Sequence, residues 1–208
     1  AQDIKPIIGL EAYVAKTSLE NKDNSERSPY HLTLLAKNNI GYNNLLKLSS
    51  ISHLEGFYYR PRIDRSVLEE YSEGIIVLSG CPSGELMTHL QNEQEDDVLE
   101  TIKWYKRVFQ ENYYIEIQEH EQQQFSRLTP RLIDLANTHN IKIVATNDSH
   151  YTTNEQHKFH DLLLCIGTNT TIDDPKRFKL DGDSFYLKSS EEMEKLFEYI
   201  PEAIYNTQ

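Results

Sequence analysis

The sequence is poor in several features, and each shortage excludes a class of protein. Only two cysteines occur in 208 residues, Cys81 and Cys165, which excludes a disulfide framework and favours a reducing compartment. No apolar run approaches the roughly 20 residues of a membrane-spanning helix, and no basic-then-apolar segment directs export, so we expect a cytoplasmic protein. Basic residues are outnumbered, with 21 Lys and Arg against 33 Asp and Glu. The net charge of −12 argues against a general duplex-DNA clamp and fits a metal site, a protein partner or solubility.

The order of predicted elements indicates an α/β fold. Apolar runs typical of strands fall at residues 6–14, 31–36, 74–79, 113–117, 141–145 and 185–188. Helical spacing covers residues 39–53, 66–71, 84–90, 97–109, 129–138, 154–166 and 189–199, and Pro201 begins one more short helix. We expect the first two strands to pair antiparallel through a flexible loop at 16–29, and the later strands to run parallel because helices separate them. Pro130 is expected in the first turn of its helix.

The stretch 141–150 contains a predicted buried strand followed by a carboxylate and an imidazole, two groups that can bind a metal or transfer a proton. Its β-branched apolar run leads directly into Asp148 and His150. Residues two apart in an extended segment point the same way, so this carboxylate and imidazole can bind one metal ion or share a proton. The alternative is a surface turn in which Asp148 caps the following helix.

Other predicted strands also contain, or end in, residues that bind metals. Glu11 lies inside the first strand, where it either ligates a metal or alternates outward to water. Cys81 follows the strand at 74–79 as a soft ligand or a small buried hydrophobe, and His120 follows the strand at 113–117. Because functional groups gather at the carboxyl ends of barrel strands, these residues together favour a metal cluster. Carboxylate, imidazole and thiolate together suit zinc, or manganese or iron where oxygen ligands dominate. Such a cluster would lower the pKa of a bound water and polarise a phosphate oxygen.

The stretch 56–62 is aromatic and basic in an otherwise acidic chain. It either stacks a base and grips a phosphate, or forms a packed loop with its arginines in ion pairs, and we favour the packed loop. His157, His160 and Cys165 lack the spacing of a zinc finger, so we assign them to the surface and core of a helix.

Six stretches, in order and over nearly the whole chain, resemble a known family. They are IKPIIGxE (4–11), HLTLLAKN (31–38), LEGFYY (54–59), LSGC (78–81), VATNDxHY (144–151) and DDP (173–175). The chain resembles the PHP (polymerase and histidinol phosphatase) domain family, in the form found in the alpha subunit of bacterial replicative DNA polymerase III. The resemblance implies a distorted seven-stranded β/α barrel with up to three metal ions at the carboxyl ends of its strands.

The resemblance also implies a set of site residues. The family's ligands match Glu11, Cys81, His120, Asp148 and His150, with Asp148 and His150 as the catalytic pair and zinc or manganese as the metal. We expect His31 to be a weaker candidate, because it opens its strand and would face the wrong rim. Some members of the family are described as metal-dependent 3′–5′ exonucleases, and pyrophosphate hydrolysis has been proposed. In others the domain supports the polymerase and docks a separate exonuclease subunit.

Parts of the family pattern would lie outside the sequence. The His-x-His motif and the first two strands would precede Ile4, and the magnesium-binding aspartates of the polymerase core would follow Gln208. We therefore expect a partial (β/α)7 barrel with exposed strand edges over residues 1–188, and the helical start of a connection to the polymerase core over 189–208.

Three functions are consistent with this reading. The first is a metal-dependent phosphoesterase within a DNA-directed DNA polymerase that binds DNA, a sliding clamp and an exonuclease subunit. The second is a non-catalytic module that supports the polymerase and docks the exonuclease. The third is a separate phosphatase for a small phosphate ester, which the polymerase-like stretch 54–59 and the helices at 190–204 argue against.

Overall fold

The computed structural model describes residues 5–120, 123–180 and 182–208, so Ile4 of the first matching stretch lies outside the described residues. The chain divides into two compact units. The first runs to Glu116 and includes Ala136–Lys142, and the second comprises Ile117–Leu135 and Ile143–Gln208. Each unit carries part of the predicted ligand set.

The strands confirm the expected α/β class. Within the described residues the six strands are β1 (Gly9–Val14), β2 (Tyr30–Ala36), β3 (Arg62–Ile63), β4 (Ile75–Leu78), β5 (Tyr113–Gln118) and β6 (Lys142–Thr146). They form an open sheet in the order β3-β1-β2-β4-β5-β6. The β1–β2 pair is antiparallel and the β4–β5 pair is parallel, both as predicted, while β4 runs antiparallel to β2. The two-residue strand β3, parallel to β1, was not predicted.

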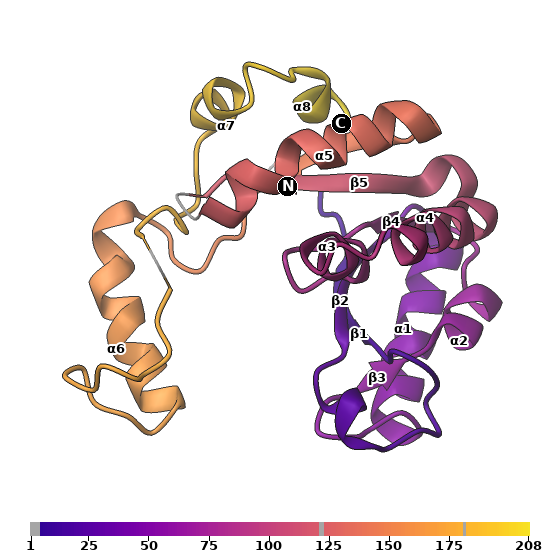
Figure 1. Ribbon diagram of the computed structural model, residues 1–208, viewed down its shortest axis with the longest axis horizontal. Helices are drawn as coiled ribbons and strands as arrows, with labels where there is room; N and C mark the ends of the chain where they lie inside the picture. The colour runs from indigo at the N-terminus through magenta and orange to yellow at the C-terminus, as the bar shows by residue number, and fades with distance from the viewer. Residues whose placement is uncertain (1–4, 121–122, 181) are drawn as a thin grey trace. The chain divides into compact units, whose positions relative to one another are not determined.

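Helices follow most of the strands. They are α1 (Asn39–Leu54), α2 (Arg65–Glu70), α3 (Glu85–Gln91), α4 (Glu95–Phe109), α5 (Gln123–His139), α6 (His157–Gly167), α7 (Ser190–Leu196) and α8 (Glu202–Tyr205). Short 3-10 turns lie at Asn24–Arg27, Gln110–Asn112 and Asn154–Gln156. Asn38 caps α1 by accepting the Gly41 amide, and Ser189 begins α7 in a reciprocal capping box. In the first unit α1 packs against β1 to β4, and α3 packs against α4 and β2 (Figure 1).

The alternation of side chains along β2 separates an apolar face from a polar one. Leu32 and Leu34 are buried in the core, whereas His31 and Thr33, which point the opposite way, are only half-buried. Glu11 on β1 lies directly across from Thr33 in the antiparallel register. Glu11 and His31 therefore share the polar face of the sheet, which is where a metal site can form.

Two element predictions are wrong. Helix α5 begins at Gln123, so Pro130 lies inside the helix and not in its first turn. Proline removes one intrahelical hydrogen bond, but Leu132 and Leu135 are buried, and this packing outweighs the local preference. At the predicted strand 185–188, the described residues form only an isolated β-bridge between Tyr186 and Tyr151, and no continuous strand.

The loop at 16–29 packs through a buried ion pair whose acidic partner, Glu26, the sequence pattern did not indicate. Arg62 Nη1 lies 3.0 Å from Glu26 Oε2, and both side chains are 0% exposed. Arg62 also donates to the carbonyl oxygens of Leu19, Asn21 and Gly56. For Arg62 the favoured reading of the stretch 56–62, an arginine held in an ion pair, is thus confirmed.

Candidate metal centre

Three ligand-type side chains of the first unit converge beside the sheet. His31 Nδ1 lies 3.0 Å from Glu11 Oε1 and 3.6 Å from Cys81 Sγ. Within the described residues this is the one set of at least three His, Cys, Asp or Glu whose ligand atoms all lie within 4.8 Å of one another. Two of its members, Glu11 and Cys81, are predicted ligands.

The expectation that His31 would face the wrong rim is contradicted. Because β2 is antiparallel to both β1 and β4, the beginning of β2 lies at the edge where β1 and β4 end. His31 pairs with Tyr13 and stands diagonally from Glu11 on the same face, while Cys81 follows the end of β4. The antiparallel direction of β2, which was predicted correctly, therefore places His31 beside Glu11 and Cys81.

The spacing of these donors fits a tetrahedral metal ion. With metal bonds of about 2.1 Å to nitrogen and 2.3 Å to sulfur, the two ligand atoms should be about 3.6 Å apart. The observed separation of His31 Nδ1 from Cys81 Sγ is 3.6 Å. Two bonds of about 2.1 Å would place nitrogen and oxygen about 3.4 Å apart, so the 3.0 Å contact with Glu11 needs to open only slightly. The set of one thiolate, one imidazole and one carboxylate suits zinc.

The electrostatics of His31 follow from the same contacts. Cys81 and then Glu11, as hydrogen-bond partners, raise the pKa of His31 to about 9. A protonated imidazole cannot coordinate a metal, so metal binding at neutral pH would displace this proton. The two partners hold the ring in place with Nδ1 directed toward them.

The second unit places the other predicted residues around Phe185. Asp148 Oδ1 lies 3.2 Å from His150 Nε2, and the two side chains are 44% and 38% exposed. The carboxylate and the imidazole therefore lie in contact and are reachable from solvent. The His150 ring meets Phe185 edge-on at 5.7 Å, while the buried His120 ring stacks on Phe185 with centroids 4.3 Å apart.

His120 is held neutral in this environment. Burial, followed by the positive charge of Lys188, lowers the pKa of His120 to about 4, although Asp148 acts in the opposite direction. Its Nδ1 lies 3.2 Å from Ser184 Oγ, a contact that fixes the ring orientation. A neutral, oriented imidazole is the form that binds metals. Ser184, Phe185 and Lys188 were not identified from the sequence, because they act through the position of His120.

The predicted ligands thus fall into two groups. Glu11 and Cys81 meet in the first unit, while Asp148 and His150 meet in the second unit beside His120. A single pocket containing all five stays a prediction. Cys165 is buried in α6 and His157 is exposed on it, whereas His160 is half-buried with its ring centroid 5.2 Å from that of His150.

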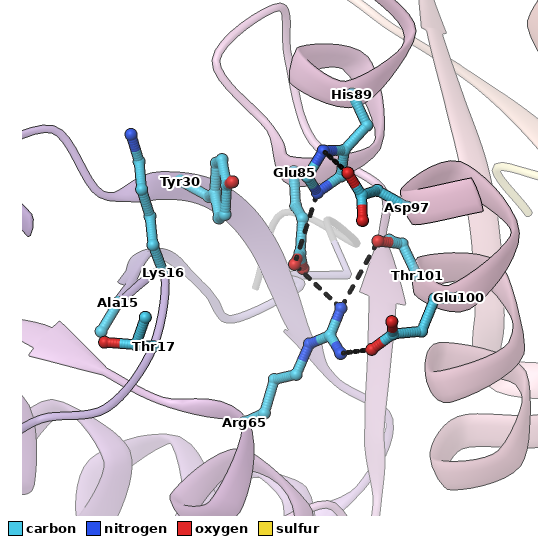
Figure 2. Close-up of a pocket in the computed structure, with 10 residues that line it drawn as sticks. All are labelled: Ala15, Lys16, Thr17, Tyr30, Arg65, Glu85, His89, Asp97, Glu100 and Thr101. Carbon is cyan, nitrogen blue, oxygen red and sulfur yellow. Dashed lines mark hydrogen bonds and ion pairs between the residues drawn. The ribbon is translucent and has the colours of Figure 1, made fainter. Parts of the chain in front are cut away.

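A cavity of about 300 Å³ opens elsewhere in the first unit. Figure 2 shows it between Lys16 and Tyr30 on one side and a network of charged side chains on the other. Arg65 donates to Glu85 at 2.8 Å, and His89 Nε2 lies 4.0 Å from Glu85. The side-chain hydrogen bond with Glu85 is the largest of the effects that raise the pKa of His89. The three carboxylates of this network, from Glu85, Asp97 and Glu100, pair with Arg65 or His89, so ion pairs hold the walls of the cavity together.

No helix in the described part of the chain is both long and apolar enough to span a bilayer.

Comparison with known proteins then decides the family. A profile of the PHP domain matches residues 1–120, more than half of the chain.

The chain belongs to the PHP domain family.

Similar proteins are alpha subunits of DNA polymerase III. The chain is 46% identical over 206 residues to that of Borreliella burgdorferi, covering 98% of this chain and 18% of the relative. It is 44% identical to that of Campylobacter jejuni, covering 100% of this chain and 18% of the relative. With that of Thermus aquaticus the identity is 39%, covering 98% of this chain and 17% of the relative. The PHP chain therefore spans about a fifth of the length of these relatives.

Proposed function

We propose that this PHP chain is part of the alpha subunit of a bacterial replicative DNA polymerase III, a cytoplasmic DNA-directed DNA polymerase. The identity of 46% to such a subunit, extending over 98% of the chain, is the observation that carries this proposal. The partners would be those of a replicase: DNA, a sliding clamp and an exonuclease subunit. The polymerase chemistry, which uses magnesium, would belong to residues outside this chain.

Within that protein, the PHP segment would be a metal-dependent phosphoesterase that removes nucleotides from a DNA 3′ end. Glu11, His31 and Cys81 would hold zinc or manganese through the donors that already converge in the first unit. In the second unit, Asp148 and His150 would act as the catalytic pair, with the neutral imidazole of His120 beside them. A bound ion would polarise a phosphate oxygen and make a hydroxide nucleophile accessible at neutral pH.

The protein's own groups would orient and transfer protons in this reaction. Asp148 accepts a hydrogen bond from His150 Nε2 in the tautomer that leaves His150 Nδ1 able to accept a proton. This assigns Asp148 as the group that orients the imidazole and His150 as the proton acceptor. His120, kept neutral by burial, would supply an uncharged imidazole beside them.

The test uses the full-length protein with its polymerase residues intact. A 5′-labelled single strand is incubated with zinc or manganese, and shortening at the 3′ end is measured. Asp148→Asn combined with His150→Ala should reduce shortening at least 100-fold, while primer extension is kept. His157→Ala, which removes an exposed histidine of α6, serves as the matched control and should have no effect. Equal shortening, and equal metal content by elemental analysis, in the double variant and the wild type would contradict the proposal.

A non-catalytic role is the second candidate, and α6 favours it. This helix exposes Phe159, Leu163 and Ile166, and side chains of this kind are usually covered by another protein surface. Under this alternative the PHP segment supports the polymerase and docks the exonuclease subunit. A metal-free protein that folds, extends primers and binds the exonuclease would favour it.

A further inference from the structure

The turn after α1 displays an aromatic side chain in a strained conformation. Tyr58 and Arg60 form a bridge in which the Tyr58 amide donates to the Arg60 carbonyl at 3.0 Å, so Tyr59 is the tip of a tight turn. Tyr59 has φ of +58°, a left-handed conformation that bulky residues rarely adopt. The strain is not compensated by burial, since the Tyr59 side chain is 58% exposed and the neighbouring Phe57 is 54% exposed. Strain retained at an exposed position points to a role in binding.

Two exposed arginines accompany these rings. The Arg27 guanidinium lies over the Tyr59 ring at 4.7 Å from its centroid, and Arg60 lies over the Tyr13 ring at 5.7 Å. Neither guanidinium has an ion-pair partner among the residues that the structure describes, in contrast to the buried Arg62. The turn therefore has one arginine that packs it in place and two that offer their positive charge to a ligand.

This surface is continuous with the candidate metal centre. Tyr13 faces His31 across the β1–β2 pair, and the two rings meet edge-on with centroids 5.1 Å apart. Arg60, Tyr13 and His31 thus follow one another in contact, and His31 in turn contacts Glu11 and Cys81. A ligand lying along the turn would have one end beside the metal donors.

We propose that Tyr13, Arg27, Phe57, Tyr59 and Arg60 form a binding surface for single-stranded DNA, here named the aromatic platform. Bases would stack on Phe57 and Tyr59, and the two arginines would each hold a phosphate. Exposed aromatic rings interleaved with unpaired cations are the pattern that single strands require, and they occur here on a chain whose net charge is −12. The direction of the strand toward His31 rests on the proposed phosphoesterase function, whereas DNA binding by the platform does not.

Photo-crosslinking on the full-length protein locates the bound strand despite other DNA sites. The probe is an eight-nucleotide oligothymidylate with 5-iodouracil near its 3′ end, irradiated in EDTA, and the attached peptide is mapped by mass spectrometry. The platform predicts crosslinks within residues 57–60. Arg27→Ala with Arg60→Ala should lower that yield about tenfold and flatten its dependence on salt, since two phosphate contacts are lost.

Two variants separate binding from folding. Tyr59→Gly removes the ring and also relieves the left-handed strain, so it should keep the melting temperature while lowering the crosslink yield about tenfold. Tyr42→Ala with Lys47→Ala removes an exposed ring and a cation from α1 and should leave the yield unchanged. Absence of crosslinks at 57–60, equal yields in all variants, or loss of a protein partner without any DNA crosslink would overturn the proposal. A third outcome separates the two proposals. If the wild type shows no nuclease activity while crosslinks at 57–60 persist in the wild type and in Asp148→Asn with His150→Ala, the phosphoesterase function is refuted and DNA binding by the aromatic platform stands.

Discussion

Replacing Glu26 by glutamine should loosen the loops that surround the aromatic platform. The change keeps the shape of the side chain but leaves the Arg62 charge buried without its counter-ion, since both side chains are 0% exposed. Removing one partner of a buried ion pair costs about 3–5 kcal/mol. Arg62 keeps three hydrogen bonds to backbone carbonyls, so we expect about 3 kcal/mol, the lower end of that range.

Hydrogen–deuterium exchange of the full-length protein measures this loss locally. The Ala15 amide donates to the Ile63 carbonyl at 2.7 Å, so it reports on the loop without bonding Glu26 itself. A loss of about 3 kcal/mol corresponds to roughly 100-fold faster exchange. Glu69→Gln is the control, because Glu69 pairs with Arg107 on the surface and should cost less than about 1 kcal/mol. Equal exchange at Ala15 in the two variants would refute the reasoning.

Three other predictions concern stability. Glu85 raises the pKa of His89 in the folded state above its ordinary value, so this histidine stabilises the fold below about pH 6.5 and loses that contribution as pH rises through the raised pKa. Chemical unfolding from pH 5.5 to 9 should show a decline in stability that is smaller in His89→Gln, where only the decline from His31 is left. Gly41→Ala should lower stability by about 3 kcal/mol in thermal denaturation, because a Cβ there would lie 1.8 Å from the Gly74 carbonyl oxygen; unchanged melting would count against this packing. Ser189→Ala should cost about 1 kcal/mol, seen as faster amide exchange in the first turn of α7 only.

Patterns of short range predicted most of the fold. The apolar runs and helix caps located the main strands and helices within a few residues, because local alternation and spacing determine them. The two-residue β3 has too little sequence to form a pattern. The Glu26–Arg62 pair joins residues 36 positions apart, so no local pattern marks Glu26 as the partner of Arg62. Pro130 lies inside α5 although proline disfavours helix interiors, because tertiary packing of the helix outweighs this local preference.

The candidate site was predicted in part for a related reason. Residues that follow a strand end, such as Cys81 and Asp148, were found because parallel strands place their carboxyl ends together. His31 was ranked too low although its strand was predicted antiparallel, and the beginning of an antiparallel strand lies at the edge where its neighbours end. Supporting groups such as Ser184 contact His120 only through the folded chain, so no spacing in the sequence indicates them.

X-ray absorption spectroscopy of the zinc-loaded full-length protein tests the metal centre most directly. The account predicts one sulfur scatterer at about 2.3 Å together with nitrogen and oxygen scatterers at about 2.0–2.1 Å. The sulfur signal should disappear in Cys81→Ser and persist in Cys165→Ser, because Cys165 is buried in α6 and takes no part in the donor set. A zinc environment without sulfur in the wild type, or a sulfur signal that survives Cys81→Ser, would contradict the account.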